Sequence, residues 1–247
     1  MNIRTGNPTL KNTTFDRFRG QGLENGMTIQ GTVNKTLLLL LFLMITSIYS
    51  WNTFSANPSG ASLLMIGGAI GGFVVGLVTI FIPKISPITA PIYALLQGCF
   101  IGAISAYYNT EFEGIVIQAI LLTFGTLFSL LLAYKSGWIK VTQKFRLGIF
   151  AATGAIFVVY LISFIGRFFG FTVPHLHEAT PIGILISVVI VIIAALNLVL
   201  DFDYIDTGAK QNVPKYFEWY AGFGLMVTLI WLYIEILRLL AKIRSRK

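Results

Sequence analysis

Seven long apolar stretches dominate the chain and constrain its fold more than any other feature. A helix needs roughly 20 apolar residues to cross the hydrocarbon core of a bilayer. Helices are also the form expected here, because backbone groups in lipid must bond within their own segment and the shorter alternating strands of a β-barrel are absent. The sequence therefore predicts an all-α, polytopic membrane protein with a bundle of seven transmembrane helices within residues 36–240. The predicted spans are Thr36–Phe54, Ala61–Ile82, Ile88–Tyr107, Gly114–Tyr134, Arg146–Ile165, Pro181–Leu200 and Tyr220–Leu240.

The charge content agrees with this interpretation. Only 11% of the residues are charged, against about 25% in an ordinary soluble domain. The net charge of +8 could suggest a nucleic-acid partner, but the lysines and arginines lie at the ends of the apolar stretches. This distribution is typical of the cytoplasmic rim of a membrane protein. We therefore expect the lipid bilayer as a partner and no nucleic acid. The single cysteine, Cys99, lies in an apolar stretch and is interpreted as a small buried hydrophobe.

The two ends of the chain are predicted to be tails. Residues 1–35 are polar, lack the short apolar core of a signal peptide, and are expected to form a flexible cytoplasmic tail. Residues 241–247 form a short basic tail. The lysine and arginine bias between the connections places the N-terminus inside. One feature opposes this orientation, because an odd number of spans then puts the basic residues after Leu240 outside.

Small residues recur every four positions in the second and third predicted spans. Such rows allow helices in lipid to approach closely, and tight packing is the favoured interpretation over a wall that slides or lines a narrow path. The rows are Gly68, Gly72 and Gly76, then Ala90, Ala94, Gly98, Gly102 and Ala106. Three polar side chains inside the spans, Gln97, Gln118 and Asn197, are expected to form interhelical hydrogen bonds or to face a water-filled cavity.

Acidic residues gather in and beside the last two spans. Five of the ten acids lie there: Asp201, Asp203, Asp206, Glu218 and Glu235. A charge within a membrane span is costly and is functional by default. Carboxylates suit calcium or protons, and crowded or desolvated ones become sensitive to pH. The alternative is structural: residues 201–206 would be a solvated helix end beside Lys210 and Lys215, and Glu235 would pair with Arg238.

No motif indicates an enzyme. The chain lacks a Gly-x-Ser-x-Gly elbow, a His-Glu-x-x-His pair and a phosphate-binding glycine loop. His175 and His177 lie beside Glu178 and would form only a weak metal site. A retinal Schiff base is excluded because the seventh span contains no lysine. We expect a non-enzymatic protein without a cofactor, apart from a calcium ion at Asp203.

Several segments resemble the Bax inhibitor family in its bacterial YccA-like branch. The specific ones are Asn-Leu-Val-Leu-Asp-Phe-Asp-Tyr-Ile-Asp (197–206), Pro-Lys-Tyr-Phe-Glu-Trp-Tyr (214–220) and Ile-Leu-Arg-Leu-Leu (236–240). Pro-Ile-Thr-Ala-Pro-Ile-Tyr-Ala-Leu-Leu-Gln-Gly (87–98) looks like the same branch. The resemblance covers essentially all seven spans. It implies a seven-helix protein of the bacterial inner membrane with a cytoplasmic N-terminus.

The resemblance also implies a function. Several members of the family are associated with a pH-sensitive calcium leak that depends on one aspartate in each of the last two helices. Asp203 matches the first position, whereas the second falls near Thr228, with Glu218 and Glu235 as the nearest acids. The leading hypothesis is a pH-sensitive cation leak centred on Asp203. The alternatives are a non-conducting regulator or substrate of a membrane-anchored AAA protease, contacted through the N-terminal tail, and a small-solute transporter.

Overall fold

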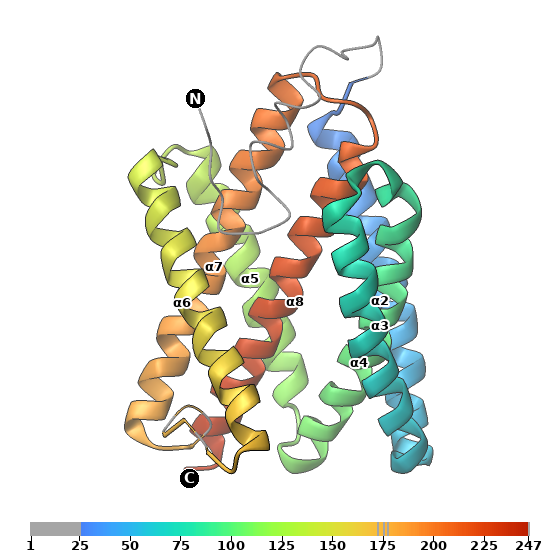
Figure 1. The fold of residues 1–247 in the computed structure, drawn as a ribbon, viewed down its shortest axis with the longest axis vertical. Coiled ribbons are helices and arrows are strands. Elements are labelled where there is room, and N and C mark those ends of the chain that lie inside the picture. The colour runs from blue at the N-terminus through green and yellow to red at the C-terminus, as the bar shows by residue number, and fades with distance from the viewer. Residues whose placement is uncertain (1–25, 172, 175, 177, 247) are drawn as a thin grey trace. The chain divides into compact units, whose positions relative to one another are not determined.

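The computed structural model describes residues 26–171, 173–174, 176 and 178–246. These residues form seven long α-helices and one short 3₁₀-helix (Figure 1). All seven long helices are apolar enough to cross a membrane, which confirms the predicted fold class. The elements are α2 (Ile29–Ala56), α3 (Pro58–Phe81), η1 (Pro83–Ile85), α4 (Ser86–Glu111), α5 (Ile115–Lys135), α6 (Gln143–Phe168), α7 (Pro181–Lys210) and α8 (Phe217–Arg244).

All seven long helices extend beyond the predicted apolar stretches at one end or both, and α2, α7 and α8 do so by the most residues. Helix α2 begins seven residues early because the Thr28 side chain caps it, accepting a hydrogen bond from Gly31 N. Helix α7 continues past Leu200 to Lys210, so the acidic stretch is helical throughout. Helix α8 runs to Arg244, which makes part of the predicted C-terminal tail helical. The flexible tail was predicted for residues 1–35, but residues 29–35 are helical in α2, and residues 1–25 lie outside the described residues.

Two compact units divide the described residues. One contains residues 114–202 and 228–246, and the other contains residues 26–113 and 203–227. We call them the α5–α6 unit and the α2–α4 unit. Helices α7 and α8 each contribute to both, with α7 divided after Phe202 and α8 before Thr228.

The small-residue rows hold the α2–α4 unit together. A Cβ atom added to Gly68 of α3 would lie 2.5 Å from Leu96 O of α4. One added to Gly102 of α4 would lie 2.2 Å from Ser47 O of α2. Hydrogen bonds span the same contact, since the Ser47 hydroxyl donates to Gly98 O at 3.1 Å and the Ser50 hydroxyl to Cys99 O at 2.7 Å. The close packing predicted from the rows is confirmed.

Polar side chains join helices within the α5–α6 unit. The Asn197 amide of α7 donates to the Thr153 hydroxyl of α6 at 2.9 Å. Arg244 near the end of α8 donates to the Gln118 side-chain oxygen of α5, also at 2.9 Å. Both predicted interhelical partners are thereby confirmed. Gln97, in the other unit, lies against Gly72 of α3.

Candidate functional site

Three of the predicted acids are buried, and two of the three lie well inside a membrane-spanning helix. Asp201 of α7 and Glu235 of α8 are each 1% exposed, and both belong to the α5–α6 unit. The interpretation of residues 201–206 as a solvated helix end is therefore wrong for Asp201, because α7 continues for nine residues beyond it. Burying a carboxylate in a membrane span costs free energy, so we expect both acids to serve the fold or the function.

Glu235 is held by two side chains. The Tyr160 hydroxyl of α6 donates to both carboxylate oxygens at 3.0 Å, and Arg238 Nη1 lies 3.2 Å from Oε1. The Arg238 guanidinium also lies 5.5 Å from the centre of the Tyr160 ring, which adds a cation–π contact. The pairing of Glu235 with Arg238 is confirmed. Tyr160 was not predicted from the sequence, although a tyrosine in the middle of an apolar span is a signal for a polar partner.

The basic residues at the end of α8 lie on the helix face that also carries Glu235. Glu235, Arg238 and Lys242 follow at spacings of three and four residues, which places them in one row. The Lys242 ammonium donates to Leu176 O at 2.8 Å, Gly183 O at 3.0 Å and the Ser187 hydroxyl at 2.7 Å. An ammonium has three hydrogens to donate, and each of these contacts uses one. Lys242 therefore fastens the connection before α7 and its first two turns to the end of α8.

Replacing Lys242 by methionine should release that connection. We expect the Lys242→Met variant to be cleaved several-fold faster by chymotrypsin after Phe169 or Phe171, both of which are exposed. Lys140→Met, at an exposed position in the connection before α6, is the control and should match the wild type. Equal cleavage of the two variants would show that the three hydrogen bonds do not hold the connection.

Asp203 and Asp206 lie in the last turns of α7, in the α2–α4 unit. Both are half-buried. Asp206 forms an ion pair with Lys210, which is exposed, and Asp203 also interacts electrostatically with that lysine. For Asp206 the interpretation as a helix end beside Lys210 is confirmed. Exposed pairs of this kind contribute little to stability.

Glu218 anchors the start of α8 in the α2–α4 unit. Its side chain is fully buried, and Oε1 accepts hydrogen bonds from Thr28 N at 3.0 Å and the Thr28 hydroxyl at 2.9 Å. Lys215 Nζ lies 2.8 Å from the same oxygen. A Cβ atom at Gly31 would lie 2.0 Å from Oε1, so only glycine leaves room for the carboxylate there. Glu218 thus joins α8 to the capped N-terminus of α2.

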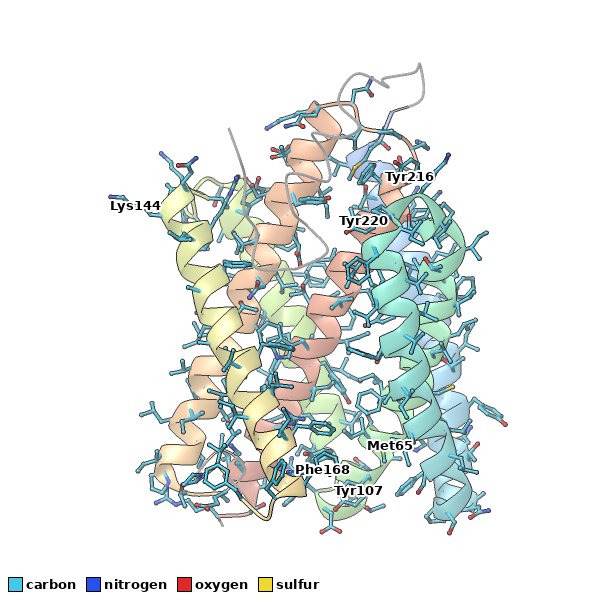
Figure 2. All side chains as sticks on the ribbon, in the orientation of Figure 1. Met65, Tyr107, Lys144, Phe168, Tyr216 and Tyr220 are labelled. Carbon is cyan, nitrogen blue, oxygen red and sulfur yellow. The ribbon has the colours of Figure 1, made fainter. Side chains whose placement is uncertain are left out.

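Aromatic rings and backbone contacts surround this junction. Tyr216 stacks on Phe217 with the ring centres 4.8 Å apart, and Phe217 contacts Tyr220 edge-on at 5.7 Å. Tyr216 and Tyr220 lie on either side of the first residue of α8 (Figure 2). Burial raises the pKa of the Tyr216 phenol. Met27 N donates to Val213 O at 2.7 Å, so the residues before α2 are attached to those before α8. The junction is structural, and none of its contacts was predicted from the sequence.

The five predicted acids are therefore divided between the two units. Asp201 and Glu235 belong to the α5–α6 unit, and the other three belong to the α2–α4 unit. In the part of the chain that the structure describes, no three His, Cys, Asp or Glu side chains come together as a metal site. A calcium ion at Asp203 would need its other ligands from carbonyl, amide or water oxygens. His175 and His177 lie outside the described residues.

A bundle of apolar helices with buried carboxylates in its last two spans defines a multi-pass membrane protein. The family model described as Bax inhibitor 1 like matches residues 7–245, nearly the whole chain, so this protein belongs to that family. The chain matches no curated protein and no solved structure. The family predicted from the motifs is confirmed, and the bacterial YccA-like branch stays a prediction.

Proposed function

We propose that this protein is a pH-sensitive leak for cations, calcium in particular, in the bacterial inner membrane, with its N-terminus in the cytoplasm. The observation that carries the proposal is the burial of Asp201 and Glu235 within membrane-spanning helices. Buried acids in such helices commonly mark ion or proton pathways. The protein would act without catalysis, and Asp203 would remain the central carboxylate for the cation.

The contacts of Glu235 supply a way to couple protonation to conformation. As a carboxylate, it accepts hydrogen bonds from Tyr160 and attracts Arg238. Protonation would remove the negative charge of Glu235 and with it the attraction between Glu235 and Arg238. The contact between α6 and α8 would then weaken within the α5–α6 unit. Low pH is therefore expected to favour the conducting state.

Calcium flux into liposomes tests the proposal. Wild-type protein should leak calcium at a rate that differs between about pH 6 and about pH 8. Glu235→Gln should lose most of this pH dependence, and Asp201→Asn and Asp203→Asn should change the flux several-fold. Glu113→Gln, in the connection between α4 and α5, is the control and should leave the flux unchanged. The absence of a leak at every pH, or an unchanged leak in all three variants, would refute the proposal.

The other functions predicted from the sequence remain open to test. The contact with a membrane-anchored AAA protease would use the N-terminal tail, whose residues 1–25 lie outside the described part of the chain. The small-solute transporter has no observation in its favour among the described contacts. Both stay predictions.

A further inference from the structure

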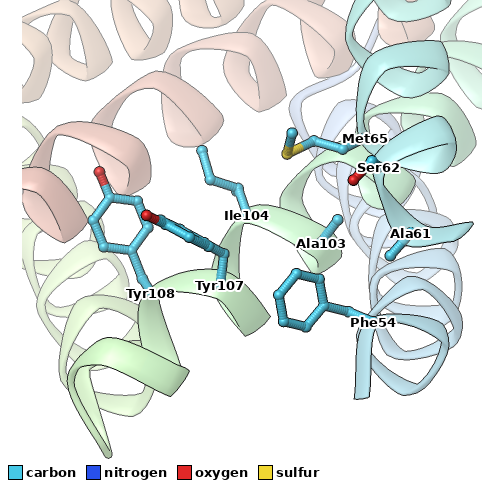
Figure 3. Close-up of a pocket in the computed structure, with 8 residues that line it drawn as sticks. All are labelled: Phe54, Ala61, Ser62, Met65, Ala103, Ile104, Tyr107 and Tyr108. Carbon is cyan, nitrogen blue, oxygen red and sulfur yellow. The ribbon is translucent and has the colours of Figure 1, made fainter. Parts of the chain in front are cut away.

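A pocket of about 430 Å³ lies in the α2–α4 unit, at the ends of three membrane-spanning helices (Figure 3). Phe54 lies two residues before the end of α2, and Ala61 lies three residues after the start of α3. Tyr107 and Tyr108 lie in the last turn or so of α4, which ends at Glu111. At 1.5 Å per residue, these positions are within about 6 Å of their helix ends. The pocket is therefore at the level of the membrane interface.

The interior of the pocket is apolar. Figure 3 shows the Tyr107 and Tyr108 side chains on one side and Met65 and Phe54 on the other. Ala61 and Ala103 are buried and form small positions in the wall. The volume falls within the range of about 300 to 1,000 Å³ that is usual for small-molecule sites. Such a lining would accept an apolar body and disfavour a charge deep inside.

The rim of the pocket, by which we mean the helix ends next to the residues that line it, carries acidic residues. Glu111 follows Tyr107 by four residues and Tyr108 by three, so the three side chains share one face of α4. Glu111 is exposed, as is the Tyr107 ring. The turn between α2 and α3 and the connection between α4 and α5 contain no lysine or arginine, and the latter adds Glu113. An aromatic face beside a carboxylate favours an organic cation, and the same rim disfavours an anionic headgroup.

We propose that this pocket binds a small amphipathic organic cation. The apolar part would occupy the space between Phe54, Ala61 and Ala103, and the ammonium group would lie over the Tyr107 ring beside Glu111. A free small molecule is favoured over a phospholipid, because the volume suits one short apolar body and the rim lacks a basic residue for a phosphate. None of the acids of the proposed leak lines this pocket, so either proposal can fail without the other.

Equilibrium dialysis against the protein in lipid nanodiscs tests the site, with empty nanodiscs to correct for partitioning. The probes are decyltrimethylammonium, the neutral decanol and the anionic decanoate. We expect saturable binding of the cation in excess of the empty discs, and no such excess for the other two. Glu111→Gln should weaken binding of the cation by about 2- to 5-fold, since an exposed ion pair is worth up to about 1 kcal/mol.

Two matched variants of α3 test the place of binding. Ser62 lines the pocket and is exposed, so Ser62→Trp should fill the space and abolish the excess binding. Leu63, the next residue, is 75% exposed and does not line the pocket, so Leu63→Trp should bind like the wild type. Equal binding of all three probes, or cation binding that survives in Ser62→Trp and in Glu111→Gln, would overturn the proposal and leave membrane lipid as the occupant. Both positions are exposed, so neither substitution enters the packed interior, and a melting curve of each variant checks that it folds.

Discussion

Replacing Gly102 by alanine is expected to destabilise the α2–α4 unit by about 1–3 kcal/mol or more, the usual cost of forcing extra volume into a packed contact. The new Cβ would lie 2.2 Å from Ser47 O and 2.7 Å from Ser47 Cα. Both atoms belong to the backbone of α2, so no side-chain rotation can make room. Helices α2 and α4 would have to separate. The loss should appear as a lower free energy of unfolding in detergent micelles.

Two neighbouring glycines of α3 provide the control. A Cβ at Gly67 meets nothing within 4 Å, whereas one at Gly68 lies 2.5 Å from Leu96 O. Alanine stabilises a helix interior by about 1 kcal/mol relative to glycine. Gly67→Ala should therefore be neutral or stabilising, and Gly68→Ala should destabilise as Gly102→Ala does. If all three variants unfold alike, helix propensity decides their stability and the close packing does not.

The second large effect is expected at Glu218. Glu218→Ala removes the acceptor of two hydrogen bonds from Thr28 and the partner of Lys215. At about 1 kcal/mol for each lost contact, the variant should lose about 3 kcal/mol of stability. The N-terminal turn of α2 should also exchange its amide hydrogens faster, because its connection to α8 is gone. Hydrogen exchange resolved to residues 26–35 measures this directly.

A double-mutant cycle separates the contact from general damage at that position. Thr28→Val removes the hydroxyl that donates to Glu218 and keeps the backbone donor. Residues in direct contact show coupling energies of about 0.5–3 kcal/mol, whereas independent residues are additive. Additive losses for Thr28→Val and Glu218→Ala would contradict the proposed junction between α2 and α8.

The spans were predictable from the sequence because lipid imposes a minimum apolar length on each helix. The same argument misplaced several helix ends. Hydropathy marks where a helix leaves the lipid, whereas the helix itself ends only where the backbone conformation changes. Helix α7 illustrates this: the aspartates end the apolar stretch, but the chain leaves the helix only near Asn212, whose φ is 51°. Asparagine tolerates this left-handed conformation better than most residues.

The candidate acids were also visible in the sequence, because a charge in an apolar stretch stands out. Their partners were not. Tyr160 lies 75 residues before Glu235, and Thr28 lies 190 residues before Glu218. Only the Arg238 and Lys210 pairings could be anticipated, since they follow from spacing along one helix. The burial of Asp201 depends on packing that no local pattern reports.

The contacts of Lys242 have a consequence for the order in which the chain assembles. The connection before α7 reaches its final position only when Lys242, 66 residues after Leu176, is present to hold it. A ribosome delivers that lysine after helices α5, α6 and α7 have already been made. The α5–α6 unit therefore completes its fold only once α8 has been made, although chains commonly begin to fold from the N-terminus during synthesis.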